Sequence, residues 1–530
     1  MRLPAALLPL RHPAFRLLWL ANLCANTGMW MQNTGAGWLM TSLTPSASMV
    51  SMIQVAILLP TFLLALPAGA IADLVDRRRY LLATQAWMAA CGMLLTVLAA
   101  SGGLGAWGLV GITFAIGIGM AMTSPAWGAT TPEVVPRADL PQAIVLNGMG
   151  FNLTRAVGPA IAGFVVAAAG PEATFAINAF CLLLVIGALA RWKREEAPRV
   201  GPREHLFSAM RAGVGFVRAS PVMRATTIRG IVFFMFGAAV WGLLPLLVRV
   251  QLGLGPEWFG ILLGAMGTGA VSGGFLLPLL RARHGRGQIV TGAALLANAM
   301  LILLGQSSHW AMAFIAMFTF GMAWIAGAST LQASAQLSVP AWVRARALGI
   351  YQVATFGGLT LGAIFGGWAA EALGLGFALG AAGLVGGIAA LATHRMKLEP
   401  PPVAPPSTAP LPVPEPVDAA LLREVAAAGQ EVLEVVRYTI APANRAAFLA
   451  AMAECRQVRR RVGALDWRLA EDMAHPERWV EIWSVASWTD HLREAGRLTE
   501  ADQAALAAAA ALHRGPGPPE AVRYASIAPR

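Results

Sequence analysis

Polar side chains that lie inside otherwise apolar stretches are the residues of this chain best suited to binding chemistry. Arg155 is the most informative of them, because a cation within a long apolar segment needs an acid, an anionic substrate or a hydrogen-bonding neighbour. The amide and guanidinium groups of a second set could bind a ligand or could hold helices together. This set comprises Asn26, Gln32, Asn33, Asn147, Asn152 and Arg229.

A short charged connection, the gating segment from Gly69 to Arg79, indicates a second kind of chemistry. Gly69 would let two helices approach closely, and Asp73 stands where the preceding apolar stretch ends. The Asp73 carboxylate could pair with Arg77 and Arg78, or with helix N-termini across an interface, and hold one side of the molecule shut. The sequence therefore predicts a gate at this connection.

The elements that must position these residues are long apolar helices. The chain has 530 residues, of which 57% are hydrophobic and 12% charged, whereas soluble domains carry about 25% charged residues. A chain this apolar needs a lipid phase, which a helix crosses in about 20 residues. We predict twelve spans, at 16–40, 48–70, 81–101, 105–128, 141–169, 172–192, 225–248, 257–280, 287–305, 309–332, 345–370 and 375–394.

The connections between these spans alternate between cationic and nearly uncharged. Arginines precede the first span and follow every even-numbered one, and only Arg249 breaks this pattern. The rule that cationic loops stay inside then predicts that both ends of the membrane part face the cytoplasm. The net charge of +12 is explained by these loops, so we expect no nucleic-acid partner.

The two halves of the membrane part repeat at an offset of 204 residues. This offset superimposes glycines and arginines over a long range, as in the pairs Gly69 and Gly273, Gly117 and Gly321, Gly158 and Gly362, Gly163 and Gly367, and Arg77 and Arg281. A parallel repeat of six spans is typical of two-bundle transporters, with the substrate path between the bundles. The predicted fold is an all-α polytopic membrane protein with twelve transmembrane helices in two six-helix bundles.

Composition divides the rest of the chain. We expect bundles at 1–192 and 225–395, a cytoplasmic connector at 193–224, a proline-rich linker at 396–429 and a soluble α+β domain at 430–530. The connector includes an amphipathic stretch at 205–218. The last domain is predicted to contain strands at 432–440, 464–471, 478–486 and 521–527 and helices at 445–461, 488–496 and 500–513.

Cysteine usage gives no support for a disulfide framework or a zinc site. The four cysteines are scattered and form no CxxC pair. We therefore expect no metal site and no cofactor.

The gating segment resembles the signature loop of the major facilitator superfamily, Gly-x-Leu-Ala-Asp-Arg-x-Gly-Arg-Arg, between spans two and three. Gly69, Asp73, Arg77 and Arg78 match this loop, whereas Asp76 stands where the family has glycine. The resemblance implies a secondary transporter that works by alternating access. The second half has no acid at this point, where Pro278 follows Gly274, so gating is expected to depend on the first copy.

A second motif, Gly158-Pro159-Ala160-Ile161-Ala162-Gly163, resembles the Gly-Pro-x-x-Gly-Gly motif of exporters in the same superfamily. Together with 131–136 and 28–39, it is similar to the transmembrane secretion effectors, the branch that includes the enterobactin exporter. The resemblance implies export of a siderophore, drug or other small amphipathic metabolite across the bacterial inner membrane, driven by protons. Spans one and four lack the acid of many proton antiporters, so the coupling residue is unassigned.

The C-terminal domain resembles the ferredoxin-like domains of the antibiotic-biosynthesis-monooxygenase type, which pair into β-barrels. Its first strand, Glu434 to Thr439, lacks the asparagine of the haem-degrading members. A homodimer through this domain, or ligand sensing, is favoured over catalysis, so the chain is not expected to be an enzyme. The alternative is a membrane-tethered monooxygenase-like enzyme or ligand sensor.

Overall fold

The computed structural model describes residues 5–192, 206–340, 343–399, 430–494 and 497–526, with a few residues between 418 and 425. The proline-rich stretch 400–417 and the connector residues 193–205 lie outside the described residues. The chain divides into two compact units. The first comprises Met1–Val200, Thr227–Ala333 and Tyr351–Met396, and the second comprises Gly201–Thr226, Ser334–Ile350 and Lys397–Arg530.

Helices begin and end close to the predicted spans in the first half of the membrane part. A short 3₁₀ turn, Ala5–Arg11, comes first. The six long helices are α1 (Pro13–Leu43), α2 (Ala47–Leu74), α3 (Arg77–Ala100), α4 (Ala106–Val134), α5 (Leu140–Ala169) and α6 (Pro171–Arg191).

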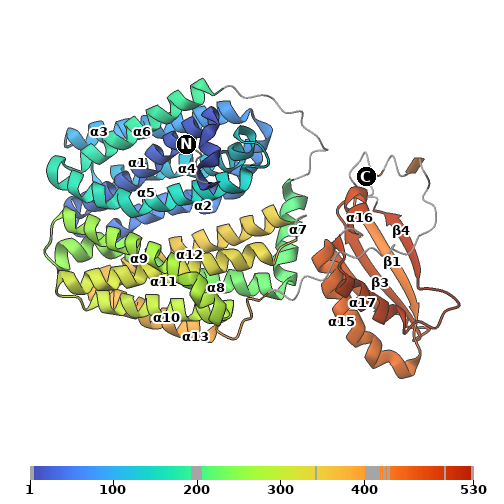
Figure 1. The fold of residues 1–530 in the computed structure, drawn as a ribbon. Coiled ribbons are helices and arrows are strands. Elements are labelled where there is room, and N and C mark those ends of the chain that lie inside the picture. The colour runs from blue at the N-terminus through green and yellow to red at the C-terminus, as the bar shows by residue number, and fades with distance from the viewer. Residues whose placement is uncertain are drawn as a thin grey trace. The chain divides into compact units, whose positions relative to one another are not determined.

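The second half follows the same pattern. Its helices are α8 (Pro221–Leu246), α9 (Pro256–Arg283), α10 (Arg286–Gly305), α11 (Trp310–Leu337), α12 (Arg344–Leu373) and α13 (Leu375–Ala392). A π-helical turn, Leu247–Gln251, extends α8. Figure 1 shows α1–α6, in blue to teal, gathered in one bundle, and α8–α13, in green to orange, in another. The amphipathic stretch predicted in the connector is α7 (Leu206–Ala219).

Local signals explain where these helices stop and start. Ser46 caps α2, because its hydroxyl accepts a hydrogen bond of 3.3 Å from the Met49 amide. Asp76 caps α3 in the same way, accepting a bond of 2.8 Å from the Arg79 amide. Gly170 and Gly374 have φ of 79° and 90°, so they turn the chain sharply after α5 and α12.

The number of candidate spans differs from the prediction. Among the described residues, eleven helices are long and apolar enough to cross a membrane, and α1 is not one of them. With 31 residues, α1 is long enough to span, but its asparagines and glutamine lower its hydropathy. These polar residues are Asn22, Asn26, Gln32 and Asn33.

The C-terminal domain has a four-stranded antiparallel sheet in the order β2-β3-β1-β4. Its elements, in chain order, are β1 (Val432–Thr439), α15 (Arg445–Val462), β2 (Asp466–Glu471), β3 (Arg478–Val485), α16 (Trp488–Glu494), α17 (Glu500–Ala510) and β4 (Glu520–Ala525). Tyr438, Phe448, Met452 and Trp483 are among the side chains of its apolar core. The element types predicted from the sequence are all present, with ends that differ by a few residues.

Candidate functional site

Arg155 lies on the stripe of α5 that faces α1. Phe151 and Gly158, one turn to either side of Arg155, both contact Trp30 of α1. The Phe151 and Trp30 rings lie 6.4 Å apart, and a Cβ added to Gly158 would lie 2.8 Å from the Trp30 Cβ. Residues four and three apart share a helix face, so the Arg155 side chain belongs to the same surface.

The Arg155 guanidinium is incompletely satisfied. Its Nη2 atom is buried and has no hydrogen-bond partner among the described residues. An unsatisfied donor of this kind costs about 1–3 kcal/mol, and more when it carries charge. In the part of the chain that the structure describes, this atom has no neighbour of the kind expected for a helix-bracing arginine, which favours the ligand-binding alternative.

Aromatic rings from both bundles gather beside this surface. The ring centroids of Trp30 of α1 and Trp241 of α8 lie 6.0 Å apart. The Trp241 ring meets that of Trp324 of α11 edge-on, with a centroid distance of 6.3 Å. Trp324 stacks on Phe320 at 5.7 Å and contacts Phe233 at 5.4 Å. The site therefore combines one cation with a set of ring faces, a combination that suits an amphipathic organic ligand.

A seam of small residues joins α5 to α9. The closest approach is Gly163 against Gly260, where a Cβ on either residue would lie 2.8 Å from the other's Cα. A Cβ on Gly267 would likewise lie 2.5 Å from Ala156 Cα. Small side chains allow such contact between membrane helices. The exporter motif thus contributes to helix packing, because Gly158 packs against α1 and Gly163 packs against α9.

Beyond this seam, polar contacts join the two bundles at the end that carries the α1–α2 and α8–α9 connections. Arg249 Nη1 donates to Thr41 Oγ1 at 3.0 Å, and its guanidinium lies 5.6 Å from the Trp38 ring centroid. Glu371 accepts hydrogen bonds from Ser46 Oγ at 2.8 Å and from the Ser48 amide at 3.1 Å. Sequence reasoning did not assign Arg249 to a site, although it was the one cation that broke the charge alternation.

A cavity of about 620 Å³ opens at the same end. It is lined by Trp38, Leu39, Ser42, Val166, Pro171, Glu172, Arg249, Gly253, Leu254 and Gly255. Because residues of both bundles line it, a change in the separation of the bundles would change its size.

The arginines of the gating segment contact helix ends of their own bundle. Arg77 forms an ion pair with Glu133 and donates to the Ala129 carbonyl at 3.1 Å. Arg78 Nε donates to the Leu189 carbonyl at 2.9 Å. These bonds satisfy carbonyls near the C-terminal ends of α4 and α6, where the helix dipole also favours cations.

The other two gating residues are placed differently. Asp73 belongs to the last turn of α2, and its side chain lies outside the described residues. The close approach expected at Gly69 is not found among the described residues, because a Cβ added there meets nothing within 4 Å. Its repeat mate Gly273 is tightly packed, since a Cβ there would lie 2.8 Å from Met322 Cα.

Asp139, at the start of α5, anchors the N-terminal segment. Its Oδ2 atom lies 2.8 Å from Arg11 Nη2 and 2.8 Å from His12 Nε2. The hydrogen bond with His12, together with Arg11, holds the pKa of the Asp139 carboxyl below its usual value. This carboxylate therefore holds the N-terminal segment against the start of α5.

The remaining predicted polar residues mostly bond within their own bundle. Asn178 Nδ2 donates to Gln32 Oε1 at 2.5 Å, and Asn147 Nδ2 donates to Thr131 Oγ1 at 3.1 Å. Arg229 donates to the Met396 and Gly287 carbonyls. These contacts favour helix bracing for Gln32, Asn147 and Arg229.

The last three members of the set are Asn26, Asn152 and Asn33. Asn26 and Asn152 donate to carbonyls one turn back on their own helices, at 2.9 Å each. Asn33 is half-buried. The structure therefore places Arg155 on the same face of α5 as Phe151 and Gly158, which contact Trp30, whereas most of the second set bonds within its own helix or bundle.

Comparison with known proteins gives one family. A family model described as transmembrane secretion effector matches residues 4–530. The staphyloferrin A transporter of Staphylococcus aureus (strain NCTC 8325 / PS 47) is 24% identical over 47% of this chain and 63% of its own length. Macrolide efflux protein A of Streptococcus pyogenes is 23% identical over 50% of this chain and 66% of its own. Each of these matches spans just under two thirds of the relative's length.

A longer match and two solved structures agree with this result. Enterobactin exporter EntS of Escherichia coli O1:K1 / APEC is 25% identical over 60% of this chain and 76% of its own. A bacterial homologue of the human lysosomal transporter Spinster, crystallised inward-facing and unoccupied, has a TM-score of 0.58 at 14% identity, covering 72% of this chain and 98% of its own.

A D-xylose–proton symporter has a TM-score of 0.56 at 15% identity, covering 72% of this chain and 99% of its own. At these identities the two structures establish the fold only. The family model, which spans nearly the whole sequence, establishes more: the chain belongs to the transmembrane secretion effectors, transporters of the major facilitator type.

Proposed function

We propose that the protein is a secondary active exporter that moves a small amphipathic organic molecule, such as a siderophore or drug, across the cytoplasmic membrane by alternating access. The observation that carries this proposal is the buried Nη2 of Arg155, which has no partner among the described residues and lies on the face of α5 whose Phe151 contacts Trp30. A cation among ring faces suits a ligand that has an anionic group and a flat apolar part. The names of the siderophore and macrolide relatives support this class of substrate.

The deciding experiment compares metabolites in the medium of a deletion strain and its parent, and then tests Arg155 variants on the molecule found. Arg155→Ala should abolish export while the protein still inserts in the membrane. Arg155→Lys should keep part of the export with weaker apparent affinity, because lysine keeps the charge but loses the planar fork. Arg191→Ala is the matched control, since among the described residues Arg191 donates to the Gly187 carbonyl of its own helix and to no other group.

A structural role for Arg155 would give a different pattern. Arg155→Ala would then lower the melting temperature in detergent, and the surviving protein would export with unchanged apparent affinity. Unchanged stability together with unchanged affinity would reject both roles. A deletion strain that accumulates less of the molecule inside the cell than its parent would indicate uptake instead of export.

Orientation and energy coupling are parts of the same proposal. With α1 as a twelfth span, both ends of the membrane part face the cytoplasm, and the proton gradient drives export. A C-terminal fusion to an enzyme active only in the periplasm should therefore be silent. An active fusion would mean that the number of spans is odd.

We also propose that Asp73 gates the cytoplasmic side. Asp73→Asn keeps the size and removes the charge, so it should reach the membrane normally and lose most export. Normal export by this variant would show that Asp73 does not gate the cytoplasmic side.

For the C-terminal domain we propose a ferredoxin-like fold, supported by its element order and by the strand order β2-β3-β1-β4. Homodimer formation through this domain stays a prediction, which the mass of the purified chain in detergent would test.

A further inference from the structure

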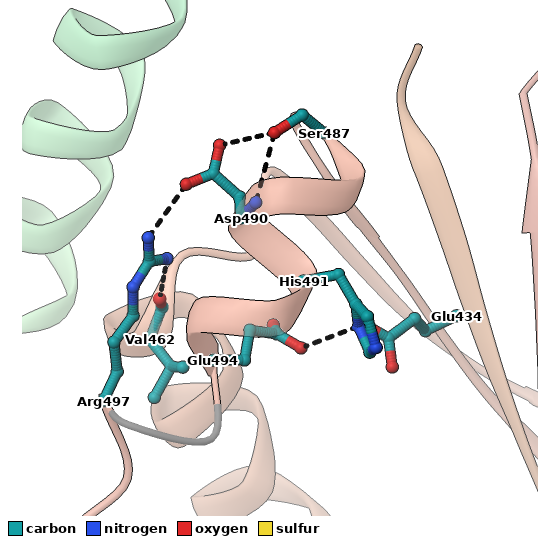
Figure 2. A network of polar contacts seen from close by, with 7 residues as sticks. All are labelled: Glu434, Val462, Ser487, Asp490, His491, Glu494 and Arg497. Carbon is teal, nitrogen blue, oxygen red and sulfur yellow. Dashed lines mark hydrogen bonds and ion pairs between the residues drawn. The ribbon is translucent and has the colours of Figure 1, made fainter. Parts of the chain in front are cut away.

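Three side chains with metal-binding atoms converge inside the C-terminal domain. Glu434 comes from β1, and His491 and Glu494 come from α16 (Figure 2). His491 Nδ1 lies 2.5 Å from Glu434 Oε1 and 3.7 Å from Glu494 Oε2. One donor atom from each residue lies within 4.8 Å of the other two.

The fold brings these residues together from a strand and from a helix. His491 and Glu494 are three apart, so they project from one face of α16. Glu434 shares the inward face of β1 with Val436 and Tyr438, two members of the apolar core. The exposed fractions of Glu434, His491 and Glu494 are 8%, 5% and 4%.

Further contacts hold α16 in place. Ser487 Oγ accepts from the Asp490 amide at 3.1 Å, which caps the start of the helix. Arg497 binds the Asp490 carboxylate at 2.8 Å and the Val462 carbonyl at 2.9 Å (Figure 2). The two ligands on α16 are therefore carried by a braced element, as a binding site requires.

One carboxylate oxygen of this group has no partner in the part of the chain that the structure describes. Glu494 Oε1 is buried and accepts no hydrogen bond from the described residues. Burying a carboxylate oxygen without a partner is costly, so such atoms usually have an ion or a water to bind. This orphaned oxygen, on a side chain that points toward His491, indicates a missing ligand (Figure 2).

Neighbouring cations only partly neutralise the two carboxylates. Arg459 and Arg523 interact electrostatically with both Glu434 and Glu494. Arg459, however, binds Glu481 at 3.3 Å and stacks over Trp483 at 3.8 Å. Arg523 lies against Trp488, 6.0 Å from its ring centroid. In the metal-bound form, in which both glutamates are carboxylates and the imidazole is neutral, the three ligands carry a charge of −2, which a divalent cation balances.

We propose that Glu434, His491 and Glu494 form a binding site for a divalent transition-metal ion of the Zn²⁺ or Mn²⁺ class, with a further coordination position open to water or a small ligand. One imidazole nitrogen and two carboxylate oxygens are a donor set that such ions accept. Ligand bonds of about 2.1 Å in a tetrahedral site place donor atoms about 3.4 Å apart. The separations of His491 Nδ1 from Glu434 Oε1 and Glu494 Oε2, 2.5 Å and 3.7 Å, lie on either side of this value, so the Glu434 side chain must rotate away from His491 to admit an ion.

The site goes beyond transport and beyond what the sequence indicated. The absence of CxxC pairs argued against zinc, but these ligands are spread over β1 and α16, with Glu434 and His491 57 residues apart. The competing arrangement has no metal and places an imidazolium between the two carboxylates.

The test uses the full-length protein in detergent, stripped with EDTA and dialysed. Zn²⁺, Mn²⁺ and Co²⁺ are titrated separately by calorimetry, and retained metal is measured after desalting. The wild type should retain about one equivalent of at least one ion, and Co²⁺ should give a visible absorption band. His491→Gln and Glu494→Gln should each weaken binding about 100-fold or more.

Glu471→Gln is the matched control, because Glu471 is a carboxylate of the same domain that pairs with Arg445 on the surface. It should bind metal as the wild type does. A second measurement needs no variant: bound metal should protect His491, and not the exposed His475, from diethyl pyrocarbonate. Failure of the wild type to retain any of the three ions overturns the proposal. So does retention without protection of His491, which would locate the ion elsewhere.

Discussion

The Glu371 carboxylate of α12 accepts a hydrogen bond of 2.8 Å from Ser46, the residue that caps α2 in the other half of the molecule. It also accepts from the Ser48 amide, so it adds a second cap to the same helix. The contact therefore couples the capping of the α2 N-terminus to the distance between the two bundles. In a transporter that alternates between states, such a contact stabilises the state in which this end is closed.

Glu371→Ala should weaken that closure. Loss of a helix cap costs about 1 kcal/mol, which shifts a two-state equilibrium about fivefold. A cysteine reporter at Val166, which is buried in the cavity at this end, should then react faster with an impermeant maleimide in a background lacking the four native cysteines. Glu257→Ala is the control, as its carboxylate lies in the first turn of α9. Equal rates for both variants would show that Glu371 has no part in closure.

The α5–α9 seam gives a second prediction. Gly163→Ala places a Cβ 2.8 Å from Gly260 Cα and 2.8 Å from the Pro256 carbonyl oxygen, and these backbone atoms cannot rotate away. The overpacking should cost about 1–3 kcal/mol and lower the melting temperature in detergent. Gly148→Ala on the same helix meets nothing within 4 Å, so it should be neutral or slightly stabilising. Identical melting temperatures for the two variants would mean that α5 and α9 separate at no cost.

The two halves of the membrane part use this kind of contact symmetrically. Gly163 of α5 packs on α9, and its repeat mate Gly367 of α12 packs on α2, where a Cβ would lie 3.1 Å from Ser48 Cα. The sequence repeat paired these two glycines without showing what either one touches. The structure adds that both stand where one bundle meets the other.

How much of the structure the sequence predicts depends on how far apart along the chain the interacting residues lie. Helix positions follow from apolar length and from capping residues, which are local, and the predicted elements lie close to those observed. Side-chain partners depend on how helices rotate and pack. Gln32 binds Asn178, 146 residues away, and the Glu434–His491 contact joins a strand to a helix. Polar residues within α1 lower its hydropathy, so this helix, predicted as the first span, is absent from the eleven candidate spans among the described residues.

The anchoring of Asp139 predicts a pH dependence. Its pKa is lowered in the folded state by the hydrogen bond with His12 and by Arg11. The stabilisation is therefore present above the ordinary carboxyl pKa and is lost as the pH falls through the lower, folded value. Wild type should melt above Asp139→Asn at neutral pH, and the margin should shrink as the pH falls below about 4. A margin that is unchanged at low pH would contradict this account.

Removal of the C-terminal domain should leave the membrane part folded. The domain has an apolar core of its own, including Phe448 and Trp483, so its folding does not require side chains of the transmembrane helices. A chain ending at Glu399 should insert, elute as a single species in detergent and melt cooperatively. Export should be reduced or deregulated and not abolished, because Arg155 and the rings of Trp30 and Trp241 all lie in the part that remains. The melting temperature and the export rate of the truncated and full chains decide the matter together. An aggregated or degraded truncation would show that the domain is integral to the fold, and a folded truncation without export would show that transport requires it.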